Sequence, residues 1–312
     1  MSTTLVTSYK NPDLDGVASA IAYAEFLQHL GLAASAGILG RPHVEASYVL
    51  GRFKIPLPRI IEDADEFTEV RLVDASDNGA FGGCIPIDKV TEVIDHRQVN
   101  NPNHFPKATF QLDLVGSAAT LIAEKFMRAN LGISSGAATL LYAAIISNTL
   151  NLKSSVTTFR DQQAASWLNQ VAKLPNNFWQ ELFAAKSDLS GYKLTDTMLG
   201  DFKIFTFNGK TVGITQLEIL AADKLLEQRA HEVVQALATM MSNHKLDFMF
   251  LNLIDLVADR NYFVTSDPET QILLAKVLKL IFSNNIAERP GMILRKQIAP
   301  LIQAELLLAE VG

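Results

Sequence analysis

The chain has 312 residues, of which 48% are hydrophobic and 19% are charged, so it excludes a disordered protein and predicts a globular one of about two domains. Its formal net charge of −6 excludes a basic nucleic-acid-binding surface over the whole molecule, while a local basic pocket for a small anion is compatible with it. Its single cysteine, Cys84, excludes an internal disulfide and a zinc site made of several thiolates.

Short apolar runs alternate with helical patterns over the first half of the chain. The expected strands cover residues 5–9, 33–39, 70–73 and 90–94. The expected helices cover residues 17–30, 45–53, 118–130, 137–148, 158–168 and 178–185. Because strands that alternate with helices typically pair in parallel through βαβ units, this half is predicted to be an α/β domain with a parallel sheet.

The pattern changes near residues 186–196, a polar run that we expect to link a first domain over 1–187 to a second over 196–312. Asn208-Gly209 lies between two alternating runs and predicts a β-hairpin, because both residues adopt the positive φ of a tight turn. The other expected elements are a helix over about 219–241, strands over 248–256 and 262–265, and a helix over 271–283. The second half is therefore predicted to be a smaller α+β domain.

Acidic residues follow three of the expected strands in the first half. Asp13 and Asp15 follow the first strand, Asp74 follows the third, and Asp95 with His96 follows the fourth. Because parallel strands end at one edge of their sheet, these side chains are expected to lie together where α/β sheets bind ligands. Their carboxylates would repel one another unless cations lie among them, and oxygen ligands suit magnesium or manganese. The alternative is that each acid caps the following helix independently.

These residues belong to four motifs that occur in a fixed order. The motifs are Asn11-Pro12-Asp13-Leu14-Asp15, Leu72-Val73-Asp74, Val93-Ile94-Asp95-His96-Arg97, and Ile146-Ser147-Asn148-Thr149-Leu150 with Lys153-Ser154. In order and spacing they resemble the DHH phosphoesterase superfamily and, within it, the manganese-dependent (family II) inorganic pyrophosphatases. The second half resembles the companion DHHA2 domain. That likeness rests on Asp201-Phe202-Lys203, on the Asn208-Gly209 hairpin and on Leu294-Arg295-Lys296-Gln297.

The resemblance implies a centre with two divalent ions, manganese first and magnesium or cobalt as alternatives, that share a bridging hydroxide. Asp95 would orient His96. The implied metal ligands are Asp13, Asp15, Asp74, His96 and Asn148. The implied catalytic residues are Asp13, His96 and Arg97. The residues implied to bind phosphate oxygens are Arg97, Lys203, Arg295 and Lys296, although Lys203 could be an ordinary surface lysine and the last two a solvated helix end.

The chain departs from the family pattern at four positions of this centre. Tyr9, Ala75 and Arg97 stand where the family has histidines, and Asn148 stands where it has a metal-binding aspartate. Tyr9 is a poor ligand at neutral pH because its phenol titrates at about 10. Asn148 either coordinates through its amide oxygen or is a buried amide that hydrogen-bonds a helix end. Arg97 either grips phosphate or neutralises an acidic site without a metal.

The resemblance predicts a phosphohydrolase that cleaves a phosphoanhydride, inorganic pyrophosphate first, by attack of a metal-bound hydroxide. The alternatives are an exopolyphosphatase-like hydrolase and a non-catalytic relative that binds a phosphorylated ligand or a protein partner. The resemblance also implies a homodimer. Because neither a secretory signal nor an apolar stretch of the roughly 20 residues that cross a bilayer is recognisable, we expect a cytoplasmic protein. Its expected partner is a small phosphate-containing substrate, rather than nucleic acid or a membrane.

Overall fold

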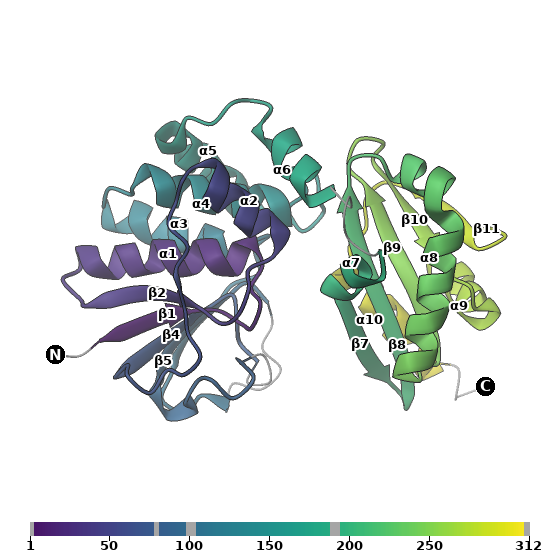
Figure 1. The fold of residues 1–312 in the computed structure, drawn as a ribbon, viewed down its shortest axis with the longest axis horizontal. Coiled ribbons are helices and arrows are strands. Elements are labelled where there is room, and N and C mark those ends of the chain that lie inside the picture. The colour runs from purple at the N-terminus through teal and green to yellow at the C-terminus, as the bar shows by residue number, and fades with distance from the viewer. Residues whose placement is uncertain (1–2, 78–80, 98–103, 188–193, 309–312) are drawn as a thin grey trace. The chain divides into compact units, whose positions relative to one another are not determined.

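The computed structural model describes residues 3–77, 81–97, 104–187 and 194–308. The chain divides into two compact units, Met1–Ala185 and Lys186–Gly312, and each contains its own sheet (Figure 1). Among the described residues, no helix is both long enough and apolar enough to cross a membrane.

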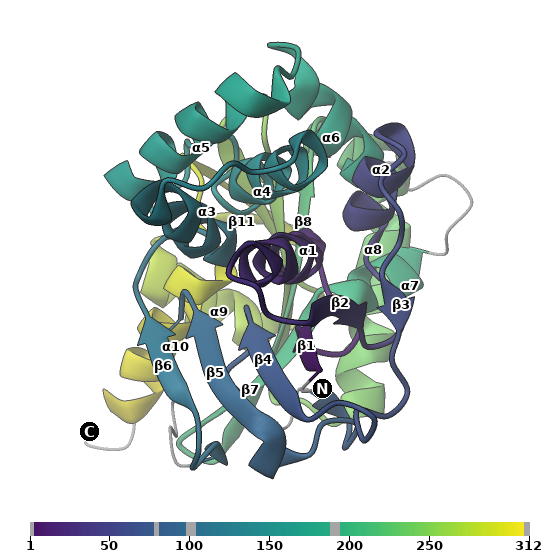
Figure 2. The same ribbon diagram turned by 90° about the vertical axis from the view of Figure 1, so that its left-hand side faces the viewer.

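The first unit contains a six-stranded sheet in which every pairing is parallel. Its strands are β1 (Thr4–Thr7), β2 (Ala34–Ile38), β3 (Arg59–Ile60), β4 (Glu69–Val73), β5 (Val90–Asp95) and β6 (Thr109–Leu112). They lie in the order β3-β2-β1-β4-β5-β6, and Figure 2 shows the arrowheads of β4, β5 and β6 at the same end. The predicted α/β class with a parallel sheet is confirmed.

The strand order determines where a ligand can bind on this sheet. From β1 the chain adds β2 and β3 on one side, and β4, β5 and β6 on the other. The crevice at the carboxyl ends of β1 and β4 is therefore the switch point at which sheets of this kind bind their ligands. The acidic motifs follow β1, β4 and β5, so the topology directs them to this edge.

Helices pack on one side of the sheet. The helices of the first unit are α1 (Leu14–His29), α2 (Val44–Arg52), α3 (Ala118–Ala129), α4 (Ser135–Asn148), α5 (Phe159–Ala172) and α6 (Phe178–Ser187). α1 packs on β1, β2 and β4, and both views show it on the same side as α3, α4 and α5 (Figures 1 and 2). α4 is apolar all round because α1, α3 and α5 surround it. Irregular segments contribute Phe67, Phe81 and Phe105 to a further apolar cluster with Leu72 of β4.

The second unit contains a mixed six-stranded sheet with the order β11-β12-β10-β9-β8-β7. Its strands are β7 (Phe202–Phe207), β8 (Lys210–Ile219), β9 (Phe248–Asp255), β10 (Arg260–Val264), β11 (Phe282–Ser283) and β12 (Ile286–Pro290). Its helices are α7 (Leu194–Gly200), α8 (Ala222–His244), α9 (Pro268–Leu278) and α10 (Arg295–Leu308). β8 and β9 are parallel, and the other pairings are antiparallel. The predicted α+β class is confirmed, and Asn208 and Gly209 form the predicted hairpin with φ angles of 51° and 74°.

The two faces of this second sheet pack against different helices. On β9, Met249, Leu251 and Leu253 belong to the apolar cluster that includes α8, whereas Phe250 belongs to the cluster that includes α9 and α10. This alternation follows from the period of two of a strand. It also explains why the sequence of β9 is a nearly continuous apolar run, since both of its faces are buried.

Several expected elements differ from the structure. The helix expected over 271–283 ends at Leu278, because Lys279 adopts a left-handed conformation, and Phe282–Ser283 forms β11 instead. The expected linker over 186–196 is partly helical at both ends, since α6 reaches Ser187 and α7 begins at Leu194. Its middle, residues 188–193, lies outside the described residues. The domain bounds of 1–187 and 196–312 stay a prediction.

Candidate metal centre

Three of the expected metal ligands meet at the carboxyl edge of the first sheet. Asp15 lies in the first turn of α1, Asp74 directly follows β4, and His96 directly follows β5. One ligand atom from each residue lies within 4.8 Å of those from the other two. All three residues are buried, with exposed fractions of 1%, 2% and 9%. The parallel sheet therefore gathers side chains from three separate segments into one buried group.

The start of α3 fixes the carboxylate of Asp15. This carboxylate accepts hydrogen bonds from the backbone N–H groups of Ala118 (2.8 Å) and Ala119 (2.8 Å), and from Nδ2 of Asn148 (2.6 Å). A carboxylate is favoured there because the first N–H groups of a helix lack partners and carry partial positive charge. Asn148 is thus a hydrogen-bonded amide, as its alternative interpretation held, but its partner is Asp15 rather than a helix end.

Asp13 lies outside the group of three, in a helix-capping position. Its Oδ1 accepts a hydrogen bond from the backbone N–H of Gly16 (3.0 Å), and its own N–H donates to the hydroxyl oxygen of Tyr9 (3.1 Å). Gly16 lets α1 approach β1, because a Cβ there would lie 2.5 Å from the Ser8 hydroxyl oxygen. Burial, together with the charges of Asp13 and Asp74, raises the pKa of Tyr9 well above 10. The Tyr9 phenol is therefore neutral and engaged in the turn.

Asp74 has an uncommon backbone conformation. Its φ is 52°, in the left-handed region that disfavours residues with a Cβ. Its Oδ1 lies 3.4 Å from Nε2 of His96 and 3.1 Å from Nη2 of Arg97. Nη2 of Arg97 also donates to the backbone carbonyl of Asp74. This second bond helps to hold the strained turn that carries the Asp74 carboxylate.

The imidazole of His96 is oriented with Nε2 facing the carboxylates. Nδ1 lies 3.1 Å from the carbonyl oxygen of Val115, so Nδ1 carries the proton of the neutral ring and Nε2 carries the second proton when the ring is charged. Nε2 lies 3.4 Å from Asp74 and 4.0 Å from Asp15. A hydrogen bond from the distal ring nitrogen is the usual support of a metal-binding histidine. Asp95 accepts from the backbone N–H of His96 (2.7 Å), so it holds the His96 backbone, and the expectation that it orients His96 stays a prediction.

Arg97 bridges the ends of β4 and β5. Its Nε donates to Oδ1 of Asp95 (3.0 Å), while its Nη2 donates to Oδ1 of Asp74 (3.1 Å). The Asp95 carboxylate is fully buried, whereas the Arg97 side chain is 43% exposed. Burial alone would lower the pKa of Arg97, but the charges of Asp74 and Asp95 outweigh it and raise the pKa. A permanent positive charge is therefore held against Asp74.

The electrostatics of the group favour a bound cation. Burial and the charge of Asp74 raise the pKa of Asp15 from 3.8 to about 7. Burial lowers the pKa of His96, but its hydrogen bond to Asp74 and the nearby negative charges outweigh burial and raise it. Both shifts have one cause, since two buried carboxylates this close resist ionising together. A cation among them would remove that penalty.

The donor set fits a hard divalent ion. Asp15 and Asp74 offer carboxylate oxygens, and His96 offers a nitrogen whose direction Val115 fixes. Oxygen ligands with one imidazole suit Mn²⁺, and carboxylates alone suit Mg²⁺. These three residues are therefore the ones that would hold an ion. Asp13 caps α1 and Asn148 donates a hydrogen bond to Asp15, so neither belongs to this group of three, and their role as metal ligands stays a prediction.

Asp161 is a buried carboxylate that the sequence analysis missed. It accepts hydrogen bonds from the backbone N–H groups of Gly116 (2.9 Å) and Thr158 (2.7 Å), and from Oγ1 of Thr120 (2.6 Å). It thereby fixes the turn that presents the first N–H groups of α3 to Asp15. The spacing of Thr158 and Asp161 is that of a capping box, which predicts the start of α5. It does not predict the hydrogen bonds of Asp161 to Gly116 and Thr120.

The expected phosphate-binding residues of the second unit differ in their surroundings. Lys203, on β7, and Lys296, on α10, are exposed. The side chain of Arg295 is only 11% exposed, and its guanidinium donates to Oδ1 (2.5 Å) and to the carbonyl oxygen (2.7 Å) of Asp201. The alternative interpretation of Arg295 as a solvated helix end is therefore wrong, because it begins α10 in a fixed position.

A buried amide network, also missed from the sequence, holds the segment before Arg295. Nδ2 of Asn252 and Nδ2 of Asn261 donate to the carbonyl oxygen of Ile293 (3.0 and 2.8 Å), and Oδ1 of Asn261 accepts from the Ile293 N–H (3.0 Å). Oε1 of Gln216 accepts from Asn252 (3.1 Å) and from the backbone N–H of Arg295 (2.6 Å). Because buried amides with paired groups specify one arrangement, this network fixes the start of α10.

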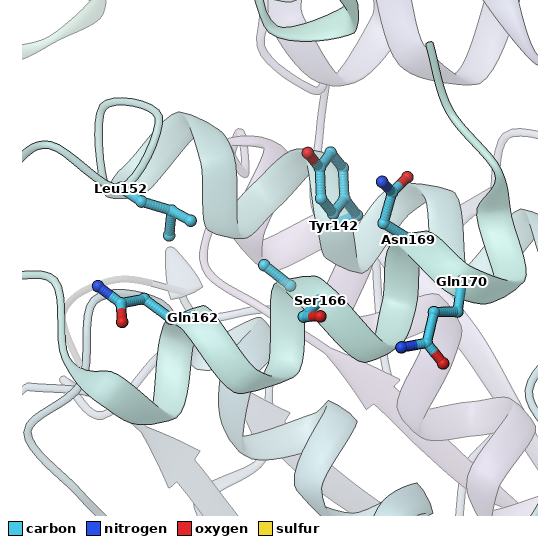
Figure 3. Close-up of a pocket in the computed structure, with 7 residues that line it drawn as sticks. Tyr142, Leu152, Gln162, Ser166, Asn169 and Gln170 are labelled. Atoms are coloured by element: carbon cyan, nitrogen blue, oxygen red, sulfur yellow. The ribbon is translucent and has the colours of Figure 1, made fainter. Parts of the chain in front are cut away.

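A pocket of about 380 Å³ lies beside α4 and α5 (Figure 3). Its polar lining is uncharged and includes Tyr142, Gln162, Ser166, Asn169 and Gln170. None of the expected metal or phosphate ligands lines it. It is therefore separate from the metal centre.

Sequence comparisons place both halves of the chain in known families. The profile of the DHH family, N-terminal domain, matches residues 3–145, and that of the DHHA2 domain matches residues 180–304. The chain is 31% identical to an Exiguobacterium protein named "Probable manganese-dependent inorganic pyrophosphatase", over 97% of this chain and 98% of that protein. It is 29% identical to the manganese-dependent inorganic pyrophosphatase of Methanothrix thermoacetophila, over 96% and 97% of the two chains.

Comparison with solved structures agrees with the sequence comparisons. A Methanococcus jannaschii protein described as a "putative family II inorganic pyrophosphatase" superposes with a TM-score of 0.77 at 28% identity, covering 96% of this chain and 98% of that one. An exopolyphosphatase-related protein from Bacteroides fragilis shares the fold, with a TM-score of 0.51 at 12% identity over 97% and 91% of the two chains. The chain therefore belongs to the DHH family, with a DHHA2 domain in its second half, in the group that contains the manganese-dependent inorganic pyrophosphatases.

Proposed function

We propose that this chain is a hydrolase of inorganic pyrophosphate that depends on a divalent metal, with manganese as the first choice and magnesium or cobalt as substitutes. The observation that carries the proposal is the buried group of Asp15, Asp74 and His96 at the carboxyl edge of the parallel sheet. The names of the similar proteins supply the substrate and the metal.

Each residue of the centre has a distinct role in this proposal. A divalent ion bound there supplies a Lewis acid that polarises water and phosphoryl oxygens. Asp15 and Asp74 would hold the ion through oxygen and His96 through Nε2, while the Val115 carbonyl accepts the proton on Nδ1 of His96. Arg97, anchored by Asp74, presents its charge to the phosphate.

Asp13 keeps a proposed catalytic role beside this group. Asp13 is half-buried. Its negative charge also raises the pKa of Asp15, although burial and the charge of Asp74 have larger effects. From the second unit, Lys203, Arg295 and Lys296 are proposed to bind phosphate oxygens, because the resemblance assigns them this role and cationic donors suit phosphate.

A second candidate is a non-catalytic relative that binds a phosphorylated ligand. The observation that favours it is that protein groups already satisfy both carboxylates of the centre. Asn148 donates to Asp15, and Arg97 donates to Asp74. Metal binding must therefore compete with these internal partners.

Phosphate release by chelator-treated protein separates the two candidates. We expect no turnover of pyrophosphate without metal, and turnover after addition of Mn²⁺, Mg²⁺ or Co²⁺. Hydrolysis that increases with the chain length of polyphosphate would favour the exopolyphosphatase-like activity. Absence of hydrolysis with every ion and substrate, at high protein concentration, would contradict the proposal and support the non-catalytic candidate.

The resemblance also implies a homodimer in the cytoplasm, and both stay predictions. Sedimentation of the purified chain measures the first, and fractionation of cells that express it measures the second.

A further inference from the structure

The residues around Asp74 bear on how many metal ions the centre holds. Two ions, as the resemblance implies, would need a second set of ligands that includes Asp13 and a side chain at position 9. Oδ1 of Asp13 is instead bonded to Gly16, and the Tyr9 hydroxyl oxygen accepts the N–H of Asp13. Over residues 3–77, 81–97, 104–187 and 194–308, only one group of three acidic, histidine or cysteine ligands meets within 4.8 Å.

The Arg97 guanidinium lies beside the ligand that two ions would have to share. It contacts both the carboxylate and the carbonyl oxygen of Asp74, and it is tied to Asp95 through Nε. The backbone N–H of Arg97 donates to the same Asp95 oxygen (3.2 Å). Nη2 also donates to Oδ2 of Asp95 (3.4 Å), so the guanidinium itself makes four hydrogen bonds to the ends of two neighbouring strands, and a metal ion cannot displace it without breaking them.

The charges of the centre also favour a single bound ion. Asp15, Asp74 and Asp95 carry three negative charges, and Arg97, which pairs with both Asp74 and Asp95, supplies one positive charge. One divalent ion neutralises the remaining two. A second divalent ion at Asp74 would lie next to the guanidinium, at a distance where like charges repel strongly in a buried site.

We propose that this centre binds a single divalent ion, at Asp15, Asp74 and His96, and that the Arg97 guanidinium replaces a second ion as a tethered positive charge. The ion count stands on the geometry alone. The further statement that Arg97 then faces a phosphoryl group rests on the proposed function. The chain would thus combine one exchangeable and one permanent cation at the same edge of the sheet.

Manganese binding to the chelator-treated full chain tests this inference without turnover. We expect equilibrium dialysis to give one tightly bound Mn²⁺ per chain, with any second ion at least about 100-fold weaker. Electron paramagnetic resonance should show an isolated Mn²⁺ ion. Two ions of similar affinity, or the spectrum of an exchange-coupled pair, would overturn the inference, and so would a chain that binds no manganese.

Two arginine variants test the role of the Arg97 charge. Arg97→Gln removes the charge beside Asp74, so we expect manganese to bind at least about tenfold more tightly or in a second equivalent. Arg128→Gln, at an exposed arginine paired with Glu124, is the matched control and should bind as the wild type does. Unchanged or weaker binding by a folded Arg97→Gln protein would contradict the inference. If that variant fails to fold, the wild-type ion count decides.

The ion count and the proposed activity can fail separately. A chain with one ion that hydrolyses no substrate retains the inference and loses the proposed function. A chain with two coupled ions that hydrolyses pyrophosphate retains the function and loses the inference.

Discussion

Nδ2 of Asn148 donates a 2.6 Å hydrogen bond to Oδ2 of Asp15, so a neutral amide at the end of α4 satisfies a carboxylate in the first turn of α1. This contact stabilises the metal-free centre, because hydrogen bonds to charged groups are among the stronger ones. It also fills a direction from which Asp15 could bind a metal ion.

Asn148→Asp should lower the stability of the metal-free protein and raise its affinity for metal. The new carboxylate would repel Asp15, so the metal-free protein should lose roughly 1–3 kcal/mol in free energy of unfolding. It would also add a charged ligand, so the affinity for Mn²⁺ should rise at least about tenfold. Denaturant titration with chelator and calorimetric titration with Mn²⁺ measure the two effects. Asn177→Asp, at an exposed asparagine of the same unit, should change neither, and weaker binding by Asn148→Asp would contradict this prediction.

The raised pKa of Asp15 predicts how pH affects the metal-free protein. Its folded-state pKa of about 7 lies above its ordinary value of 3.8, so between these pH values the folded state binds more protons than the unfolded state does. The Asp15 contribution to stability is therefore lost as pH rises from about 4 to about 7. In that range Mn²⁺ must displace a proton, and its affinity should rise with pH.

Comparison with Asp15→Asn isolates this pH effect from that of other groups. The difference in unfolding free energy between the two proteins should change by a few kcal/mol between pH 4 and pH 7 in the presence of chelator. Identical pH dependence in both proteins would refute the raised pKa.

Asp161→Asn should weaken metal binding although Asp161 lies in a second layer. The substitution removes the charge that holds Gly116, Thr120 and Thr158 and so loosens the turn that positions Asp15. Outer partners of metal ligands commonly account for about 10–100-fold in affinity, and we expect a loss in that range. Asp88→Asn, at an exposed acid of the same unit, is the control. Equal Mn²⁺ affinity in both variants would show that Asp161 supports only the fold.

Asn261→Ala should destabilise the second unit. It removes the acceptor of the buried Ile293 N–H and the donor to the buried Oδ1 of Asn252, while the Ile293 carbonyl keeps its hydrogen bond from Nδ2 of Asn252. Unpaired buried groups cost about 1–3 kcal/mol each, so thermal unfolding should begin at a lower temperature. Asn243→Ala, at an exposed position of α8, should leave the melting profile unchanged. Asn261→Ala should also loosen the segment that positions Arg295. If Arg295 binds phosphate, this variant should therefore show a larger rise in the KM for pyrophosphate than fall in kcat.

Periodicity and the acids at strand ends predicted much of the first unit. The strands β1, β2, β4 and β5 each contain buried apolar residues, and Asp15, Asp74 and His96 follow three of them. The parallel rule alone therefore placed these side chains at one edge. β3 and β6 were missed because their residues are largely exposed or half-exposed, so they carry no buried apolar run.

The finer contacts could not be predicted because they join segments far apart in sequence. The Val115 carbonyl that orients His96 and the Asp161 carboxylate that holds Gly116 depend on how α3 and α5 pack, which spacing does not specify. Asp13 could be predicted from local sequence, because an aspartate directly before a helix commonly caps it. The structure shows that Asp13 caps α1, as the alternative interpretation held. The sequence could not decide whether Arg97 grips phosphate or neutralises an acidic site, because only the structure shows that it contacts both Asp74 and Asp95.

The most direct test of the account compares His96→Gln with His29→Gln in manganese-supported hydrolysis of pyrophosphate. His96 is buried in the ligand group, whereas His29 lies at the exposed end of α1. The account predicts a loss of at least about 100-fold for His96→Gln and activity within about twofold of the wild type for His29→Gln. Equal activities of the two variants would contradict the assignment of the reaction to this centre.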